Sequence, residues 1–198
     1  MIFRALRDHL KIMRNLIQDI DPERRNRDLA RNLHSAALLR EKWSGFQADS
    51  VRVEYYADYD GPLSSCCLEL SSTDRLVYNL VNNAIRHTAD RRVKLFLRRV
   101  EQQAEIPENL QIATANRIDP GEAEQLRERF GSELGRLFAG GFTIGGRGVG
   151  LSICTELVGN AYGLEPPERA IEERYVGAEL MDEEFVAWIH WPTVYTPE

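Results

Sequence analysis

The chain has 198 residues, 43% of them hydrophobic and 28% charged, with a formal net charge of -6. This is an ordinary globular composition, sufficient for one sizeable domain with a small appendage. The acidic balance, without a basic patch interleaved with aromatic residues, argues against nucleic acid as a partner. Apolar runs stay below the roughly 20 residues that cross a bilayer, and charges interrupt the N-terminus too often for a signal peptide. The sequence therefore predicts a cytoplasmic protein with no membrane segment.

The N-terminal residues predict a helix that packs against a partner. Apolar residues recur at alternating steps of three and four, which is the narrow seam of a coiled coil. They are Phe3, Leu6, Leu10, Met13, Ile17 and Ile20. DIDPERR indicates a turn, and a second helix places Leu29, Leu33, Ala36 and Trp43 on one face. We expect residues 1–45 to form an antiparallel helical hairpin that either mediates a homodimer as a four-helix bundle or packs on its own domain.

The rest of the chain alternates between strand and helix patterns. VRVEYYADYDG and SCCLELS predict strands, and a helix follows near STDRLVYNL, with Ser72, Thr73 and Asp74 as candidate caps. RRVKLFLRRVEQQ and NLQIATAN predict two further strands, LSICTELV a helix, and RYVGAEL and EEFVAWIHWP the closing strands. About 30 residues between NLQIATAN and LSICTELV are interpreted as one irregular, glycine-rich segment, and a loop of that length is usually functional. The pattern predicts an α+β sandwich.

Two motifs in this region predict a ligand site. YNLVNNAIRHT puts three asparagines on a helix, where their side chains compete for the backbone and so indicate a cap or a ligand. GGRGVGLSI places glycines before a helix, where free backbone amides and the positive end of the helix dipole can receive phosphate. Asparagine oxygens can hold a hydrated magnesium ion and an arginine can reach a phosphate. Together the motifs predict a nucleotide site.

These motifs resemble those of a known family. DRLVYNLVNNAIRHT is similar to the asparagine box, and GRGVGLSICTELV to the second glycine box, of the ATP-binding domain of sensor histidine kinases and of the wider gyrase, chaperone, kinase and mismatch-repair ATPases. The resemblance covers about residues 46–198. It implies a two-layer sandwich, in which three helices cover one face of a mixed sheet, with a mobile lid between the boxes. It also implies that the ligands are ATP and Mg2+.

The resemblance implies roles for individual residues. Asn83 would be the magnesium ligand, Asn79 would face the phosphates one turn earlier, and Arg86 and His87 would lie near the polyphosphate. The glycine-rich segment and the helix after it would approach the phosphates through Gly146, Gly148, Gly150 and Leu151. The family's adenine-binding aspartate is replaced by Asn116, which can still offer a carbonyl oxygen to adenine. Asp119 is the alternative, through a shifted turn.

One of these positions bears on the type of reaction. In the family, members that hydrolyse ATP with water carry a glutamate general base four residues before the magnesium asparagine, one turn away on the same helix face. That position here is Asn79. Because an amide cannot take a proton from water, the sequence favours phosphoryl transfer to a protein side chain, or simple binding, over hydrolysis.

The N-terminal hairpin resembles the dimerisation and phosphotransfer module of sensor kinases. Its candidate phosphoacceptors are His9, which lies beside the seam, and His34; neither is followed by the acid that is usual in the family. The hypothesis is a sensor kinase catalytic domain that transfers the γ-phosphate of Mg-ATP to a histidine for relay to the receiver domain of a response regulator. The alternative is a degenerate ATPase fold that docks a response regulator as a phosphotransferase or scaffold.

Overall fold

The computed structural model describes residues 36–48, 50–61, 63, 70–100, 109–141 and 150–192, without the side chains of Leu70 and Ser71. These residues belong to one compact unit that begins at His34. Most of the predicted hairpin, including the seam residues, lies outside the described residues. Within the described part, no helix combines the length and the apolar character needed to cross a membrane.

The described strands form one mixed sheet in the order β1-β2-β3-β4-β6-β5. Neighbouring strands pair antiparallel, except that β2 and β3 run parallel. The strands are β1 (Gln47–Ala48), β2 (Val51–Ala57), β3 (Arg92–Val100), β4 (Asn109–Arg117), β5 (Val176–Met181) and β6 (Glu184–Pro192). The helices are α3 (Ala36–Trp43), α4 (Leu70–His87), α5 (Pro120–Phe130), the 3-10 helix η1 (Leu134–Ala139), α6 (Gly150–Tyr162) and α7 (Arg169–Glu172).

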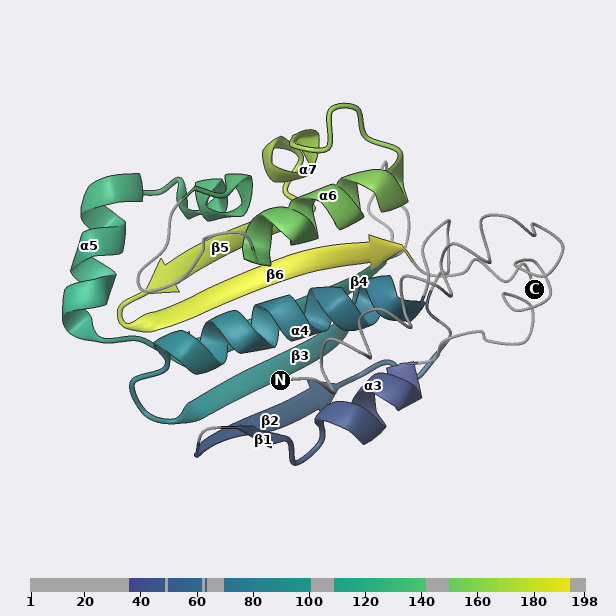
Figure 1. Cartoon of the computed structure of the whole chain (residues 1–198), viewed down its shortest axis with the longest axis horizontal. Helices are drawn as coiled ribbons and strands as arrows, with labels where there is room; N and C mark the ends of the chain where they lie inside the picture. Colours follow the sequence, from purple (N-terminus) through teal and green to yellow (C-terminus); the bar gives the residue numbers. More distant parts are fainter. Residues whose placement is uncertain are drawn as a thin grey trace, which may run out of the picture. The chain divides into compact units, whose positions relative to one another are not determined.

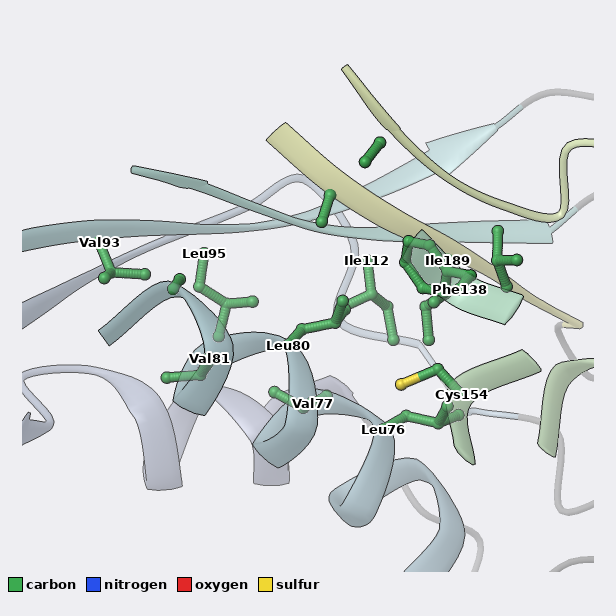
Figure 2. Packing of buried hydrophobic residues seen from close by; sticks show 14 of the residues in the cluster. Leu76, Val77, Leu80, Val81, Val93, Leu95, Ile112, Phe138, Cys154 and Ile189 are labelled. Atoms are coloured by element: carbon green, nitrogen blue, oxygen red, sulfur yellow. The ribbon is translucent and has the colours of Figure 1, made fainter. Parts of the chain in front are cut away.

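Helices α3, α4 and α6 cover the same face of the sheet, which confirms the predicted sandwich (Figure 1). The apolar residues of α4 recur every three or four positions and are buried; Figure 2 shows Leu80 beside Ile112 of β4 and Leu76 beside Cys154 of α6. The buried residues of β3 alternate, as Val93 and Leu95 show, and the polar residues between them face away from the helices. The core therefore lies between one helical layer and one sheet.

Three predictions about local structure are wrong. The last two residues of the strand predicted at SCCLELS, Leu70 and Ser71, begin helix α4, and the rest of that strand lies outside the described residues. Helix α4 begins at Leu70, so Ser72, Thr73 and Asp74 lie inside it rather than capping it. Asp74 instead accepts a hydrogen bond from Lys42 of α3, with Nζ and Oδ2 2.6 Å apart. The segment interpreted as an irregular loop of about 30 residues contains α5 and η1. Its DPG sequence is not a turn, because Asp119 caps α5 and Pro120 is the first helical residue, where proline's missing N–H costs nothing.

The first described helix, α3, is part of the sheet unit. Ala36, Leu39 and Trp43 are buried in the same core cluster as the residues of β2 and α4. The division of the chain into a hairpin at residues 1–45 and an ATP-binding domain at residues 46–198 stays a prediction.

Candidate functional site

The asparagine-rich motif forms the second half of α4. Asn79 and Asn83 are half-buried and lie one helical turn apart, so they share a face of the helix. Leu80 and Ala84 follow them directly in sequence and are buried in the core. The apolar residues therefore fix the rotation of α4 about its axis, and that rotation holds the two amides at the margin of the core.

Asn79 lies against the beginning of α6. Its amide nitrogen is buried and makes no hydrogen bond of ordinary geometry with the described residues. Its neighbour Cys154 is 0% exposed and donates to the carbonyl of Gly150, 3.6 Å away. Burial raises the pKa of the Cys154 thiol to about 12, against smaller opposing effects of Asn79 and Arg75. The thiol therefore stays neutral, and Cys154 is a core residue.

Asn116 lies on the helix-facing side of β4, opposite Phe185 of β6. It is only 3% exposed, and neither Oδ1 nor Nδ2 has a hydrogen-bond partner in the described part of the chain. Leaving one buried polar group unpaired costs about 1–3 kcal/mol. An amide with both groups unpaired therefore fits a planar ligand that offers a donor and an acceptor side by side.

Asp119, the alternative to Asn116, has a structural task. Its Oδ1 accepts a hydrogen bond from the backbone N–H of Gly121 at 2.9 Å, which caps α5. Asp119 is also exposed, whereas Asn116 is buried. The structure therefore gives Asp119 a capping role and leaves the buried amide of Asn116 without a described partner.

The end of α4 is joined to α5. His87 Nδ1 lies 2.6 Å from Oε1 of Glu122, and both side chains are largely buried. Arg86 is exposed. His87 therefore holds the beginning of α5 against the end of α4, so that α5 lies beside the C-terminal end of α4 (Figure 1).

The glycine-rich motif is described only at its C-terminal end. Gly146 and Gly148 lie outside the described residues, as do the candidate phosphoacceptors His9 and His34. Gly150 is the first residue of α6, and a Cβ at this position would meet no described atom within 4 Å. Leu151 is half-buried against the core. The space beside Gly150 is therefore not required for packing among the described residues.

A residue that sequence reasoning missed links α6 to η1. Thr155 of α6 donates a buried hydrogen bond to the carbonyl of Phe138 in η1, with oxygens 2.7 Å apart. Residues 142–149 lie between these two residues in the sequence. The sequence offers one sign of this bond, because Thr155 is a polar residue among the buried residues of LSICTELV, next to Cys154.

The described ranges contain no group of three or more His, Cys, Asp or Glu residues arranged to hold a metal ion. Magnesium commonly takes most of its ligands from phosphate oxygens and water, so a site for this ion needs few protein ligands.

The known proteins that are similar to this chain are one family and several solved structures. Among curated proteins, none matches the sequence. Similar solved structures include the catalytic domain of the histidine kinase ThkA, at 18% identity over 84% of this chain and 92% of that chain, with a TM-score of 0.47. The Acinetobacter baumannii histidine kinase AdeS is 14% identical over 96% of this chain and 83% of that chain, with a TM-score of 0.44. The histidine kinase domain of the E. coli osmosensor EnvZ is 16% identical over 83% of this chain and 91% of that chain, with a TM-score of 0.44.

The family match covers the elements that build the candidate site. Residues 70–180 match the family described as "Histidine kinase-, DNA gyrase B-, and HSP90-like ATPase". This range runs from the first residue of α4 into β5, and it includes both motifs and Asn116. The match spans more than half of the 198 residues and confirms the resemblance read from the two motifs. The chain belongs to the family of histidine kinase-, DNA gyrase B-, and HSP90-like ATPases.

Proposed function

We propose that this chain is the catalytic domain of a histidine kinase and binds Mg-ATP between α4, the end of β4 and the beginning of α6. The observation that carries the proposal is the buried Asn116, whose two polar side-chain atoms have no partner among the described residues. A purine edge supplies the adjacent donor and acceptor that this amide lacks. The half-buried Asn79 and Asn83 are then placed for the phosphate end of the nucleotide.

Each residue of the proposed site has its own role in binding Mg-ATP. Asn116 holds the base, Asn83 ligates Mg2+ together with phosphate oxygens, and Gly150 with the residues before it approaches the phosphates. Asn79 takes the position at which hydrolytic relatives would place a general base. A bound magnesium ion neutralises charge on the phosphates. Phosphoryl transfer forms a bond between an imidazole nitrogen and the γ-phosphorus and breaks the bond to the bridging oxygen, and ADP leaves.

The proposal extends to the N-terminal part of the chain. Residues 1–45 would form the dimerising hairpin and supply the phosphoacceptor, His9 or His34. The phosphoryl group would then pass to an aspartate in the receiver domain of a response regulator. What supports this extension is the seam pattern and the family resemblance of the sequence.

The first test is a calorimetric titration of Mg-ATP into the wild-type chain, Asn83→Ala and Asn82→Ala. Asn82 is the matched control, because it is also a half-buried asparagine of α4 but points about 100° away from Asn83. We expect Asn83→Ala to weaken binding about tenfold or more, equivalent to about 1.4 kcal/mol, and Asn82→Ala to leave it nearly unchanged. Wild-type protein that binds no Mg-ATP at millimolar concentration would refute the proposal.

The second test follows the phosphoryl group. Incubation with γ-labelled ATP should give acid-labile label on the protein, and either His9→Ala or His34→Ala should abolish it. Label that survives both changes would refute both acceptor assignments. Free phosphate released much faster than protein label accumulates would contradict the role given to Asn79.

One observation favours a second function, that of a non-catalytic module that docks a response regulator. Asn116 stands where the resemblance implies an aspartate, and a neutral amide loses the charge assistance of a carboxylate. A receiver domain that binds the chain equally well with and without Mg-ATP, together with no protein label, would favour this module over the kinase.

A further inference from the structure

The side-chain amide of Asn116 has no described hydrogen bond that would fix its orientation. Both Oδ1 and Nδ2 are buried and unpartnered in the described part of the chain. Asn109, on the same strand, provides the contrast: its Oδ1 lies 2.7 Å from Nδ1 of His190. An amide exchanges its acceptor and its donor when it rotates by half a turn, and no described hydrogen bond at Asn116 opposes that rotation.

The rotation matters because purines differ along one edge. Adenine offers an amino donor at C6 beside the acceptor N1. Hypoxanthine and guanine offer an acceptor oxygen at C6 beside the donor N1–H. A carboxamide matches either edge with two hydrogen bonds, whereas an ionised carboxylate has only acceptors and repels an oxygen at C6.

The charged residues closest to Asn116 in sequence have other partners. Arg117 is exposed and pairs with Glu183. Asp119 caps α5 through the N–H of Gly121. Neither of these side chains is therefore available to favour an amino group or an oxygen at C6 of the purine. The neutral amide of Asn116 remains as the group that would contact this edge of the base.

We propose that the nucleotide site accepts 6-oxopurine nucleoside triphosphates as well as ATP, because the carboxamide of Asn116 can rotate to match either purine edge. The inference rests on the proposed nucleotide binding and specifies the substrate class of that same site. It also assigns an effect to the replacement of the family's aspartate by Asn116: an aspartate would select the 6-amino purine, and the asparagine relaxes this selection.

The test is a calorimetric comparison of Mg-ATP with Mg-ITP. The two bases differ at C6 and in the proton on N1, so the pair isolates the edge that Asn116 would read. Wild-type protein should bind both with dissociation constants within about fivefold. Asn116→Asp should shift the ratio toward ATP by about tenfold or more, since one matched pair of hydrogen bonds gives about 1–3 kcal/mol of discrimination between bases.

A further variant keeps the test decisive if Asn116→Asp does not fold. Asn116→Leu has neither donor nor acceptor and should weaken ATP and ITP by similar factors. Wild-type protein that binds ATP but prefers it to ITP by more than about fivefold would overturn the inference and leave the proposed function intact. Wild-type protein that binds neither nucleotide would overturn the proposed function and the inference with it. An unchanged ratio in folded Asn116→Asp would also overturn the inference.

Discussion

The buried hydrogen bond from Thr155 to Phe138 allows a quantitative prediction. Thr155 is 3% exposed, and its hydroxyl donates to the carbonyl of Phe138 at 2.7 Å. Thr155→Val keeps the branched shape of the side chain and removes only the donor. The packing of α6 on η1 should therefore survive, while the carbonyl of Phe138 loses this hydrogen bond in a buried site.

The expected loss follows from the burial. Leaving a buried acceptor unpaired costs about 1–3 kcal/mol, so the free energy of unfolding should fall by about 2 kcal/mol. For a chain of this size, that loss lowers the melting temperature by about 4–8 °C. Because Phe138 and Thr155 flank residues 142–149, which belong to the proposed phosphate site, we also expect the variant to bind Mg-ATP more weakly.

Urea denaturation followed by circular dichroism measures the effect. Thr155→Ser is the control, since it keeps the donor and loses one methyl group, worth about 0.8 kcal/mol. The valine variant should be less stable than the serine variant, and both less stable than the wild type. Thr155→Val with wild-type stability, or a larger loss for Thr155→Ser than for Thr155→Val, would refute the reasoning.

Two further predictions concern β5 and β6. A Cβ at Gly177 would lie 2.5 Å from Cζ2 of Trp188. Gly177→Ala should therefore lower the free energy of unfolding, measured by urea denaturation, by about 1–3 kcal/mol. Gly135→Ala is the control and should lower it much less, because a Cβ there would lie 3.6 Å from its nearest described neighbour. Burial lowers the pKa of His190, so stability should be full above pH 6.5 and fall as the pH drops below it, where the unfolded chain binds the proton. Urea titrations at pH 7.5 and 5.5 should show this loss in the wild type and less of it in His190→Gln.

Strands β2 to β6 and the helices α4 and α6 were predictable, because the apolar residues of each element recur with the period of a strand or of a helix. Val93, Leu95 and Leu97 alternate along β3, and the buried residues of α4 follow the helical period. The α5 region was not predictable in the same way. Pro120 and Gly121 are turn residues and are equally suited to the first turn of a helix, so the choice depended on the cap that Asp119 supplies.

The candidate site was predictable where it follows a local motif and not where it depends on tertiary packing. Asn79 and Asn83 share a helix face by spacing alone. The choice between Asn116 and Asp119 required the burial of the first and the capping bond of the second. The bond from Thr155 joins residues far apart in the chain, which no local pattern reveals. The roles of Gly146, Gly148, His9 and His34 stay predictions.

The most direct measurement of where nucleotide binds is hydrogen exchange with and without Mg2+ and a non-hydrolysable ATP analogue. Protection should appear in peptides from the second half of α4, the end of β4 and the beginning of α6. The structure also has a groove of about 520 Å³ that includes Arg136, Arg174 and Trp188. Protection confined to peptides from that groove, with exchange in α4, β4 and α6 unchanged, would contradict the proposed site.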